Sequence, residues 1–482
     1  MTSIVERVFR IGKECPNRVA LINGKSSKTY GELLKDTLSV RNVLSAKYGI
    51  CKGDRVILAA DKQMEFVSTY FACHLLEAVA LPIAPDTNPK RYELIKTKVK
   101  PKLVVGFNDQ SDEVITAELR DLIVDEMHIC EEMSFPTLDS VADIIFTTGT
   151  TGEPKGVQLS HRNISAAARN INTFINNSSD DVEMLALPIS HSFGLGRMRC
   201  ALSNGQTLVL LGSFANVKRF FRFMNDYKVN GFGMVPASWA LLKKLSGKEI
   251  EKYRDQLRYI EIGSAPMPIE EKQYLIKALP NTRICMHYGL TEASRSAFME
   301  FHEEENRLNT VGKQSPNMII SIRDELGEEL KPGQEGEICV SGDAVTVGYL
   351  DLPKEESFWN DAFRTGDWGV KDSDGYITLK SRKKELINVG GKKVSPVEVE
   401  EVLKSIDFVD DCVCVGAPDP EGILGEVVKA FIVTDQPGMV SYEVIDPLIG
   451  TQLEGFKHPT IYNVINEIPK TTSGKVQRLS LK

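Results

Sequence analysis

The stretch IIFTTGTTGEPKGV occupies residues 144–157 and decides how the rest of the chain is interpreted. An apolar, strand-like run enters a loop that holds four threonines, three glycines and one lysine, Lys155. Glycine lets a backbone wrap closely around an anion, hydroxyl groups donate hydrogen bonds, and lysine adds positive charge. The composition predicts a loop that binds a triphosphate, and the full run TTGTTGEPKG favours this over a flexible surface loop.

Two better-known phosphate loops are excluded by spacing. A Walker A loop needs the pattern GxxxxGK, but counting from Gly149 places Pro154 where the second glycine belongs. A dinucleotide fingerprint fails as well, because the glycine pair 194 and 196 is followed by Arg199 where the last glycine should stand. A hydride-transferring dehydrogenase is therefore disfavoured.

Composition indicates an ordinary globular protein of several domains. The chain has 482 residues, of which 42% are hydrophobic and 26% charged, and its formal net charge of −8 gives no general attraction for nucleic acids. Nine scattered cysteines without a CxxC pair indicate reduced thiols. Neither a signal peptide nor an apolar run of about 18 residues is visible, so we expect a cytoplasmic protein without a membrane span.

The pattern of predicted secondary-structure segments changes twice along the chain. The first third alternates helix-like and strand-like segments, such as the helical pattern of residues 27–49 and the apolar run of residues 54–60, which predicts an α/β fold with a mainly parallel sheet. From about Thr310 short β segments are separated by Gly and Asp turns, which suits a small antiparallel sheet or barrel. The last hundred or so residues read as a separate α+β domain.

The loop also carries a family resemblance. FTTGTTGEPKG resembles the signature loop of the AMP-forming adenylating superfamily, which includes acyl- and aryl-CoA synthetases, adenylation domains of peptide synthetases and beetle luciferases. Further segments resemble that family's motifs in the family's order: TYGELL (29–34), LPISHSFGLG (187–196), GSAPMP (263–268), HYGLTEAS (287–294), GEICVSGDAVTVGYL (336–350), FRTGDWG (363–369), SRKKELINVGGKKVSPVEVEE (381–401) and PKTTSGKVQR (469–478). The resemblance covers essentially the whole chain.

The resemblance implies the fold and the domains. It implies a large N-terminal domain, residues 1–381, built from parallel-type sheets flanked by helices together with a small β-barrel. A hinge at residues 382–384, with Lys384 at the family's hinge position, would lead to a small, mobile α+β lid at residues 385–482. The family's domains alternate between one closed state for adenylation and another for the thiol step.

The resemblance also implies the reaction. A carboxylate attacks the α-phosphate of ATP, which gives an acyl-adenylate and pyrophosphate, and the thiol of CoA then attacks the activated carbonyl. Two anions must be brought together, so catalysis is expected to rest on positioning and charge neutralisation. Expected cofactors are ATP, Mg²⁺ and CoA as co-substrate. The alternative acceptor is the phosphopantetheine of an acyl or peptidyl carrier protein. A non-catalytic nucleotide-binding regulator is disfavoured, because the charged residues of the family motifs are all present: Lys155, Glu292, Asp367, Arg382 and Lys475.

Site residues follow from the motif positions. Glu292 would bind Mg²⁺, Thr291 would contact the α-phosphate, and Lys475 would bridge the substrate carboxylate and the α-phosphate. His191 would stand beside the acyl pocket, although a lone histidine is often only structural. The other nucleotide- and CoA-binding candidates are Thr147, Thr148, Gly149, Thr150, Thr151, Gly152 and Lys155 for the phosphates, Ser264, Ala265, Pro266 and Tyr288 for adenine, Asp367 and Arg382 for ribose, and Gly391 for the pantetheine tunnel.

The sequence is compatible with several classes of acid substrate. No acidic residue stands near His191 to hold a substrate ammonium group, so an α-amino acid is disfavoured. Arg197, Arg199 and Arg295 are candidates to bind a second carboxylate on the substrate, with surface or interface arginines as the equal alternative. An aryl acid, a fatty acid and a small dicarboxylic acid are all compatible with the sequence.

Overall fold

The computed structural model describes residues 1–61, 63–107, 115–123, 133–148, 154–450, 452–470 and 476–481. These residues divide into two compact units. The first comprises residues 1–320 and 340–363, and the second comprises residues 321–339 and 364–482. No helix in the described ranges combines the length and the apolar character that a membrane crossing requires.

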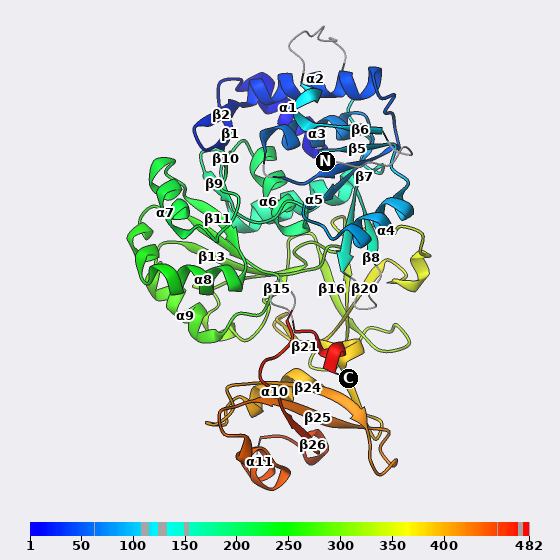
Figure 1. Ribbon diagram of the computed structural model, residues 1–482, viewed down its shortest axis with the longest axis vertical. Coiled ribbons are helices and arrows are strands. Elements are labelled where there is room, and N and C mark those ends of the chain that lie inside the picture. Colours follow the sequence, from blue (N-terminus) through cyan, green and yellow to red (C-terminus); the bar gives the residue numbers. More distant parts are fainter. Residues whose placement is uncertain are drawn as a thin grey trace. The chain divides into compact units, whose positions relative to one another are not determined.

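A nine-stranded sheet forms one half of the first unit (Figure 1). Its central strands run parallel, while β2, β14 and β15 join antiparallel. In spatial order the strands are β15 (Lys313–Gln314), β14 (Ala297–Glu300), β13 (Arg283–Tyr288), β12 (Tyr259–Ile262), β11 (Gly231–Met234), β9 (Val182–Leu185), β10 (Thr207–Leu210), β1 (Val19–Asn23) and β2 (Ser26–Thr29).

A seven-stranded sheet forms the other half of this unit. Its strands β3, β4, β5, β6 and β7 are parallel, and β8 and β18 are added antiparallel at one side. The spatial order is β18 (Gly348–Tyr349), β8 (Pro154–Ser160), β7 (Val141–Thr148), β4 (Val79–Ile83), β3 (Arg55–Ala59), β5 (Leu103–Val105) and β6 (Ile115–Ala117).

Helices cover both faces of these sheets. Because side chains alternate along a strand, Leu185 and Tyr259 enter one core and Met184 and Ile260 enter another. The first core is shared by both sheets and by α1 (Ile4–Glu14), α2 (Tyr30–Ala46), α3 (Met64–Leu75), α5 (His161–Ile175) and α6 (Ser192–Ser203), and the second contains α7 (Val217–Asp226), α8 (Pro236–Ser246) and α9 (Ile269–Ala278). A third core packs α4 (Pro89–Val99) on the seven-stranded sheet. The predicted α/β architecture with parallel sheets is confirmed.

The small barrel is not confirmed. Within the described part of the chain, β16 (Ile319–Arg323), β17 (Glu335–Ser341), β20 (Ala362–Lys371) and β19 (Phe358–Trp359) follow one another in a sheet, and β21 (Ile377–Arg382) pairs with β20. The boundary between the two compact units falls within β16, β17 and β20. The predicted boundary at residues 382–384 stays a prediction.

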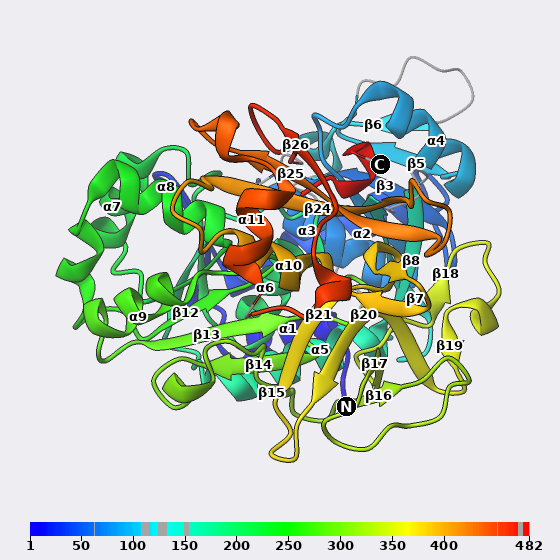
Figure 2. The same ribbon diagram turned by 90° about the horizontal axis from the view of Figure 1, so that it is seen from below.

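The second unit contains the predicted α+β region (Figure 2). One apolar core joins its helices to its strands and includes Val399, Cys414, Ala430 and Ile445. The elements are the hairpin β22 (Ile387–Val389) and β23 (Lys392–Val394), the sheet β24 (Asp411–Pro418), β25 (Glu426–Val433) and β26 (Ile461–Val464), and the helices α10 (Pro396–Leu403) and α11 (Tyr442–Ile449).

Candidate active site

The glycine- and threonine-rich loop connects two antiparallel strands. β7 leads into it and β8 leaves it, with Thr147 opposite Lys155 in the strand register. No helix begins at its end, so no helix N-terminus adds positive charge there. Positive charge is supplied by Lys155 and by Lys98, whose ammonium group donates to the Pro154 carbonyl at 3.3 Å. Residues 149–153, which include Gly149, Thr150, Thr151 and Gly152, lie outside the described ranges, as does the side chain of Thr148.

Lys155 lies over the ring of a tyrosine from a distant part of the sequence. Its Nζ is 5.1 Å from the ring centroid of Tyr349 on β18. The Tyr349 hydroxyl donates a hydrogen bond of 2.6 Å to Oε1 of Glu292. The candidate phosphate-binding lysine and the candidate metal ligand therefore contact the same side chain.

Thr291 and Glu292 lie in a turn between β13 and β14. The Leu290 amide donates to the Ala293 carbonyl at 3.0 Å, and Arg295 has a φ of +52°, a conformation no helix accommodates. Residues 292–295 therefore form a turn and not part of a helix. The Glu292 side chain is largely buried, since the residue is 8% exposed.

Two contacts fix this turn to neighbouring elements. The Glu292 carbonyl accepts a hydrogen bond of 2.7 Å from the Thr346 amide, just before β18. The hydroxyls of Thr291 and Ser192 are 3.3 Å apart. Because Ser192 begins α6 directly after His191, the turn and the start of α6 lie together.

Arg295 strengthens the link between the turn and α6. Its Nη1 and Nη2 donate to the carbonyls of Ser192 at 3.3 Å and Phe193 at 3.2 Å, and its Nε donates to Oε1 of Glu261 at 2.9 Å. A Cβ added at Gly196 would come within 2.6 Å of the Arg295 guanidinium, so this glycine leaves room for it. The sequence did not indicate this bracing contact.

The adenine candidates lie at the carboxyl ends of adjacent parallel strands. Ser264, Ala265 and Pro266 follow β12, and Tyr288 is the last residue of β13, its parallel neighbour. Ser264 has a φ of +73°, an uncommon conformation for a residue with a side chain. Ligands of open α/β sheets bind at this edge, so the placement fits a nucleotide.

Arg197 belongs to a buried network of charges. It donates to Oε1 of Glu183 at 2.7 Å and to Oε2 of Glu261 at 3.1 Å, and all three side chains are fully buried. Burial by itself would raise the pKa of Glu261, but the charges of Arg295, His287 and Arg197 hold it well below its ordinary value. Because Arg197 and Arg295 already have buried carboxylate partners, the structure does not support them as ligands of a second substrate carboxylate.

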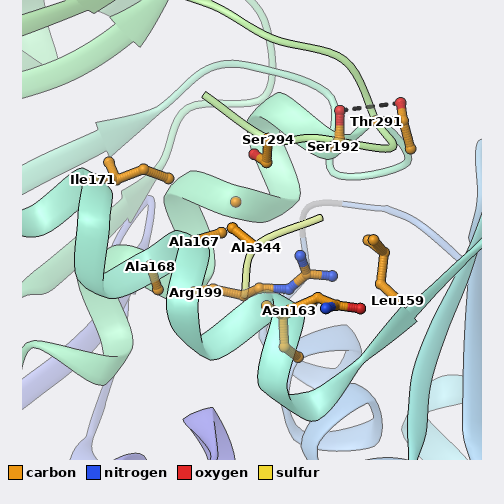
Figure 3. A pocket seen from close by; sticks show the side chains of 12 residues that line it. Leu159, Asn163, Ala167, Ala168, Ile171, Ser192, Arg199, Thr291, Ser294 and Ala344 are labelled. Carbon is orange, nitrogen blue, oxygen red and sulfur yellow. Dashed lines mark hydrogen bonds between the residues drawn. The ribbon is translucent and has the colours of Figure 1, made fainter. Parts of the chain in front are cut away.

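Arg199 points into a cavity between α5 and α6 (Figure 3). Its Nε donates to the Tyr70 hydroxyl at 2.8 Å, and Nη2 pairs with Asp143. The Ser192 and Thr291 hydroxyls close one side of the cavity. The remaining lining is Leu159, Asn163, Ile164, Ala167, Ala168, Ile171, Gly196, Ser294 and Ala344.

The ribose candidates meet within the second unit. Asp367 on β20 is directly opposite Arg382 on β21, and Nε of Arg382 is 2.8 Å from Oδ1 of Asp367. The Asp367 amide donates to the Thr365 hydroxyl at 3.0 Å, and Arg382 Nη1 donates to the Thr365 carbonyl at 3.2 Å. The carboxylate is thus held in one orientation on a paired strand.

The other second-unit candidates occupy a short helix and a hairpin. Lys384 lies in the 3₁₀ helix η5 (Lys383–Glu385). Gly390 and Gly391 form the turn between β22 and β23 with φ values of +57° and +84°, which favour glycine. Apart from its two chain neighbours, no described residue has an atom within 4 Å of a Cβ added at Gly391. Lys475 lies outside the described ranges.

The side chains near Glu292 suit Mg²⁺ rather than a metal ion that is held entirely by protein ligands. Among the described residues, no group of three or more His, Cys, Asp or Glu side chains is arranged to hold a metal ion. Mg²⁺ is commonly held by one or two carboxylates together with substrate phosphates, and it prefers oxygen ligands. Glu292, with the Thr291 hydroxyl beside it, matches that requirement.

Comparison with known proteins places these observations in a family. The AMP-binding enzyme family matches residues 8–350, and the AMP-binding enzyme C-terminal domain matches residues 398–475. A 2-succinylbenzoate–CoA ligase of Bacillus licheniformis is 29% identical over 97% of this chain and 97% of its own length.

Solved structures agree with the sequence comparison. The o-succinylbenzoate CoA synthetase of Bacillus subtilis, in complex with its acyl-adenylate intermediate, has a TM-score of 0.85 and 25% identity over 100% of this chain and 98% of its own. The same synthetase with ATP and magnesium has a TM-score of 0.86 and 26% identity over 98% of both chains. The chain therefore belongs to the AMP-binding enzyme family, and within it to the AMP-forming acid–thiol ligases of the acyl-CoA synthetase type.

Proposed function

We propose that this ligase joins a carboxylic acid to CoA in two half-reactions, adenylation with release of pyrophosphate and transfer of the acyl group to the CoA thiol. The observation that carries the proposal is the joint arrangement of Lys155, Tyr349 and Glu292, which gathers a cation and a carboxylate beside the glycine- and threonine-rich loop. Relatives named as CoA ligases support CoA as the acceptor.

During adenylation the chain has to lower the repulsion between two anions. Lys155 and the hydroxyls of the loop, including Thr147, would hold the β- and γ-phosphates, and Thr291 would donate to the α-phosphate. Glu292 would hold Mg²⁺, which when bound supplies positive charge to the phosphate oxygens. The buried turn that carries Thr291 and Glu292 is already fixed to α6 and β18, so little reorganisation is required.

Each unit contains candidate ligands for one part of the nucleoside. The turn of Ser264, Ala265 and Pro266 and the ring of Tyr288 suit the adenine base. Asp367 would accept hydrogen bonds from both ribose hydroxyls, because an ionised carboxylate is an acceptor only. The ion pair with Arg382 supports this role by holding the carboxylate in one orientation.

The remaining roles rest on motif position. We propose that Lys475 supplies positive charge to the substrate carboxylate, that His191 borders the acyl group, and that Gly391 leaves space for pantetheine. We keep residues 1–381 and 385–482 as the functional domains, with residues 382–384 as the hinge and the second domain as a mobile lid. A cytoplasmic location is part of the same proposal.

The test is a measurement of pyrophosphate release with ATP and Mg²⁺ over a panel of short alkyl, long alkyl, aryl and dicarboxylic acids, with and without CoA. We expect release with one class of acid, a higher rate with CoA and an acyl-CoA product. Release that CoA leaves unchanged would point to a carrier protein as acceptor. The absence of release with every acid, while ATP still binds, would contradict the proposed function.

A further inference from the structure

Tyr349 has none of the roles proposed above for the site residues. Its hydroxyl donates to Glu292 at 2.6 Å, and its ring faces the Lys155 ammonium at 5.1 Å. One side chain therefore contacts both the candidate metal ligand and the candidate phosphate ligand.

The backbone around Tyr349 is fixed to the same two elements. Tyr349 is paired with Val157 on β8, the strand that begins beside Lys155. Three residues earlier, the Thr346 amide donates to the Glu292 carbonyl at 2.7 Å, and the Thr346 hydroxyl donates to the Gln158 carbonyl. The segment 346–349 thus connects β8 to the turn that carries Glu292, and the tyrosine cannot shift independently of either.

We infer that Tyr349 is a positioning residue for the metal site: its hydroxyl orients the Glu292 carboxylate toward Mg²⁺ while its ring keeps Lys155 next to the phosphate loop. The inference rests on the proposed function. A phenol bonded to Oε1 selects one rotation of the carboxylate and leaves Oε2 for the metal. At 2.6 Å the bond has the length expected of a charge-assisted hydrogen bond from a hydroxyl to a carboxylate.

A second tyrosine offers a matched control. The Tyr274 hydroxyl on α9 donates to Oε1 of Glu251 at 2.9 Å, and the Lys243 ammonium lies 4.4 Å from its ring centroid. This cluster repeats the same residue types and contacts on the helix-covered outer face of the nine-stranded sheet. None of its members has a proposed role in the reaction.

The experiment is calorimetric titration of the full chain with ATP, with and without Mg²⁺, for wild type, Tyr349→Phe and Tyr274→Phe. We expect Tyr349→Phe to weaken binding in the presence of Mg²⁺ about tenfold, because loss of a partner that orients a metal ligand costs about 10- to 100-fold in affinity. Binding without Mg²⁺, and all binding by Tyr274→Phe, should equal wild type. Unchanged binding by Tyr349→Phe, or equal weakening with and without Mg²⁺, would overturn the inference.

A double-mutant cycle identifies the route of the effect. If Tyr349 acts through Glu292, Tyr349→Phe in the Glu292→Gln background causes no further loss of Mg²⁺-dependent binding, and an additional tenfold loss would contradict the inference. Should Tyr349→Phe prove unstable, Glu292→Asp provides the second test, because its shorter side chain withdraws the carboxylate from the phenol. Wild-type affinity for ATP and Mg²⁺ in Glu292→Asp would overturn the inference.

These outcomes are separate from those of the proposed function. Wild-type protein that binds ATP without any dependence on Mg²⁺, and releases no pyrophosphate with any acid, removes the proposed function and the inference with it. Wild-type protein that is active and Mg²⁺-dependent, with an unaffected Tyr349→Phe variant, removes the inference alone.

Discussion

Two clusters in the first unit contain a tyrosine, a glutamate and a lysine in the same arrangement, and they differ in how the charges are balanced. Lys243 on α8 pairs with Glu271 on α9 at 2.7 Å, and Glu251 in the 3₁₀ helix η2 (Glu249–Tyr253) pairs with Arg254 at 3.7 Å. Beside the phosphate loop, the described residues provide no ion-pair partner for Lys155 or Glu292.

The difference separates a stabilising cluster from a binding one. Half-buried charges that are paired with one another contribute little and attract no ligand. A cation and a nearly buried carboxylate held by one neutral phenol keep their charge available for phosphate and metal. Residue type and contact geometry are therefore insufficient to recognise the site, and the charge balance of the surroundings decides.

The largest expected effect tests the carboxylate in each cluster. Glu292→Gln should lower Mg²⁺-dependent pyrophosphate release about 10³-fold, because a preorganised charge at the reacting phosphates is lost. Glu251→Gln should have the rate of wild type. Both rates are measured at saturating ATP and Mg²⁺, and similar rates for the two variants would break the distinction between the clusters.

Two glycines of the second unit, Gly391 and Gly375, form another matched pair. Gly391 and Gly375 have φ values of +84° and +87°, and both would carry a side chain into open space. We expect Gly391→Leu to form thioester about 10²-fold more slowly, since a displaced thiol reacts poorly, while pyrophosphate release is unchanged. Gly375→Leu carries the same backbone strain, so equal thioester rates in both variants would remove the tunnel role of Gly391.

A smaller effect is expected for the two lysines. Lys155→Ala should reduce pyrophosphate release about 30-fold, because a hydrogen bond to a charged group contributes about 2 kcal/mol. Lys243→Ala should leave the rate unchanged, since Glu271 already neutralises Lys243. Initial rates measured over a range of ATP concentrations check this, and a wild-type rate in Lys155→Ala would contradict the phosphate role.

The smallest expected effect is on the free energy of unfolding, through Glu271 on α9 and its partner Lys243 on α8. Burial by itself would raise the pKa of Glu271, but hydrogen bonds from Lys243 and Trp239 lower it below its ordinary value. A carboxyl group whose pKa is lowered by folding adds stability above its unfolded pKa of about 4.3, and this contribution is lost as the pH falls through the folded pKa.

Glu271→Gln should therefore lower the free energy of unfolding by about 0.5 kcal/mol at pH 7. The difference from wild type should shrink as the pH falls below the unfolded pKa of about 4.3, and it should disappear at a low pH well below the folded pKa, where the carboxyl group is protonated. Urea unfolding at both pH values measures this. A difference that persists at low pH would show that packing, rather than charge, is responsible.

Local chemistry explains what the sequence predicted well. Strand and helix periods in the first third indicated the parallel α/β sheets, and the loop composition indicated a phosphate site, because both depend on residues adjacent in the chain. Asp367 and Arg382 were predicted from motifs, and the register of β20 and β21 brings them together. The roles of Lys475 and of residues 149–152 remain predictions.

Long-range pairing decided what the sequence did not reveal. Tyr349 lies in the motif GEICVSGDAVTVGYL, but the motif does not indicate its contacts. The pairing of β18 with β8 brings Tyr349 to Lys155, and the turn after β13 brings Glu292 to the Tyr349 hydroxyl. From sequence, the arginines near His191 were candidates to bind a second substrate carboxylate. In the structure Arg197 is buried and paired with Glu183 and Glu261. Residue types are recorded in the sequence, whereas the partners of a charge depend on which distant segments pack together, and that is determined by tertiary structure alone.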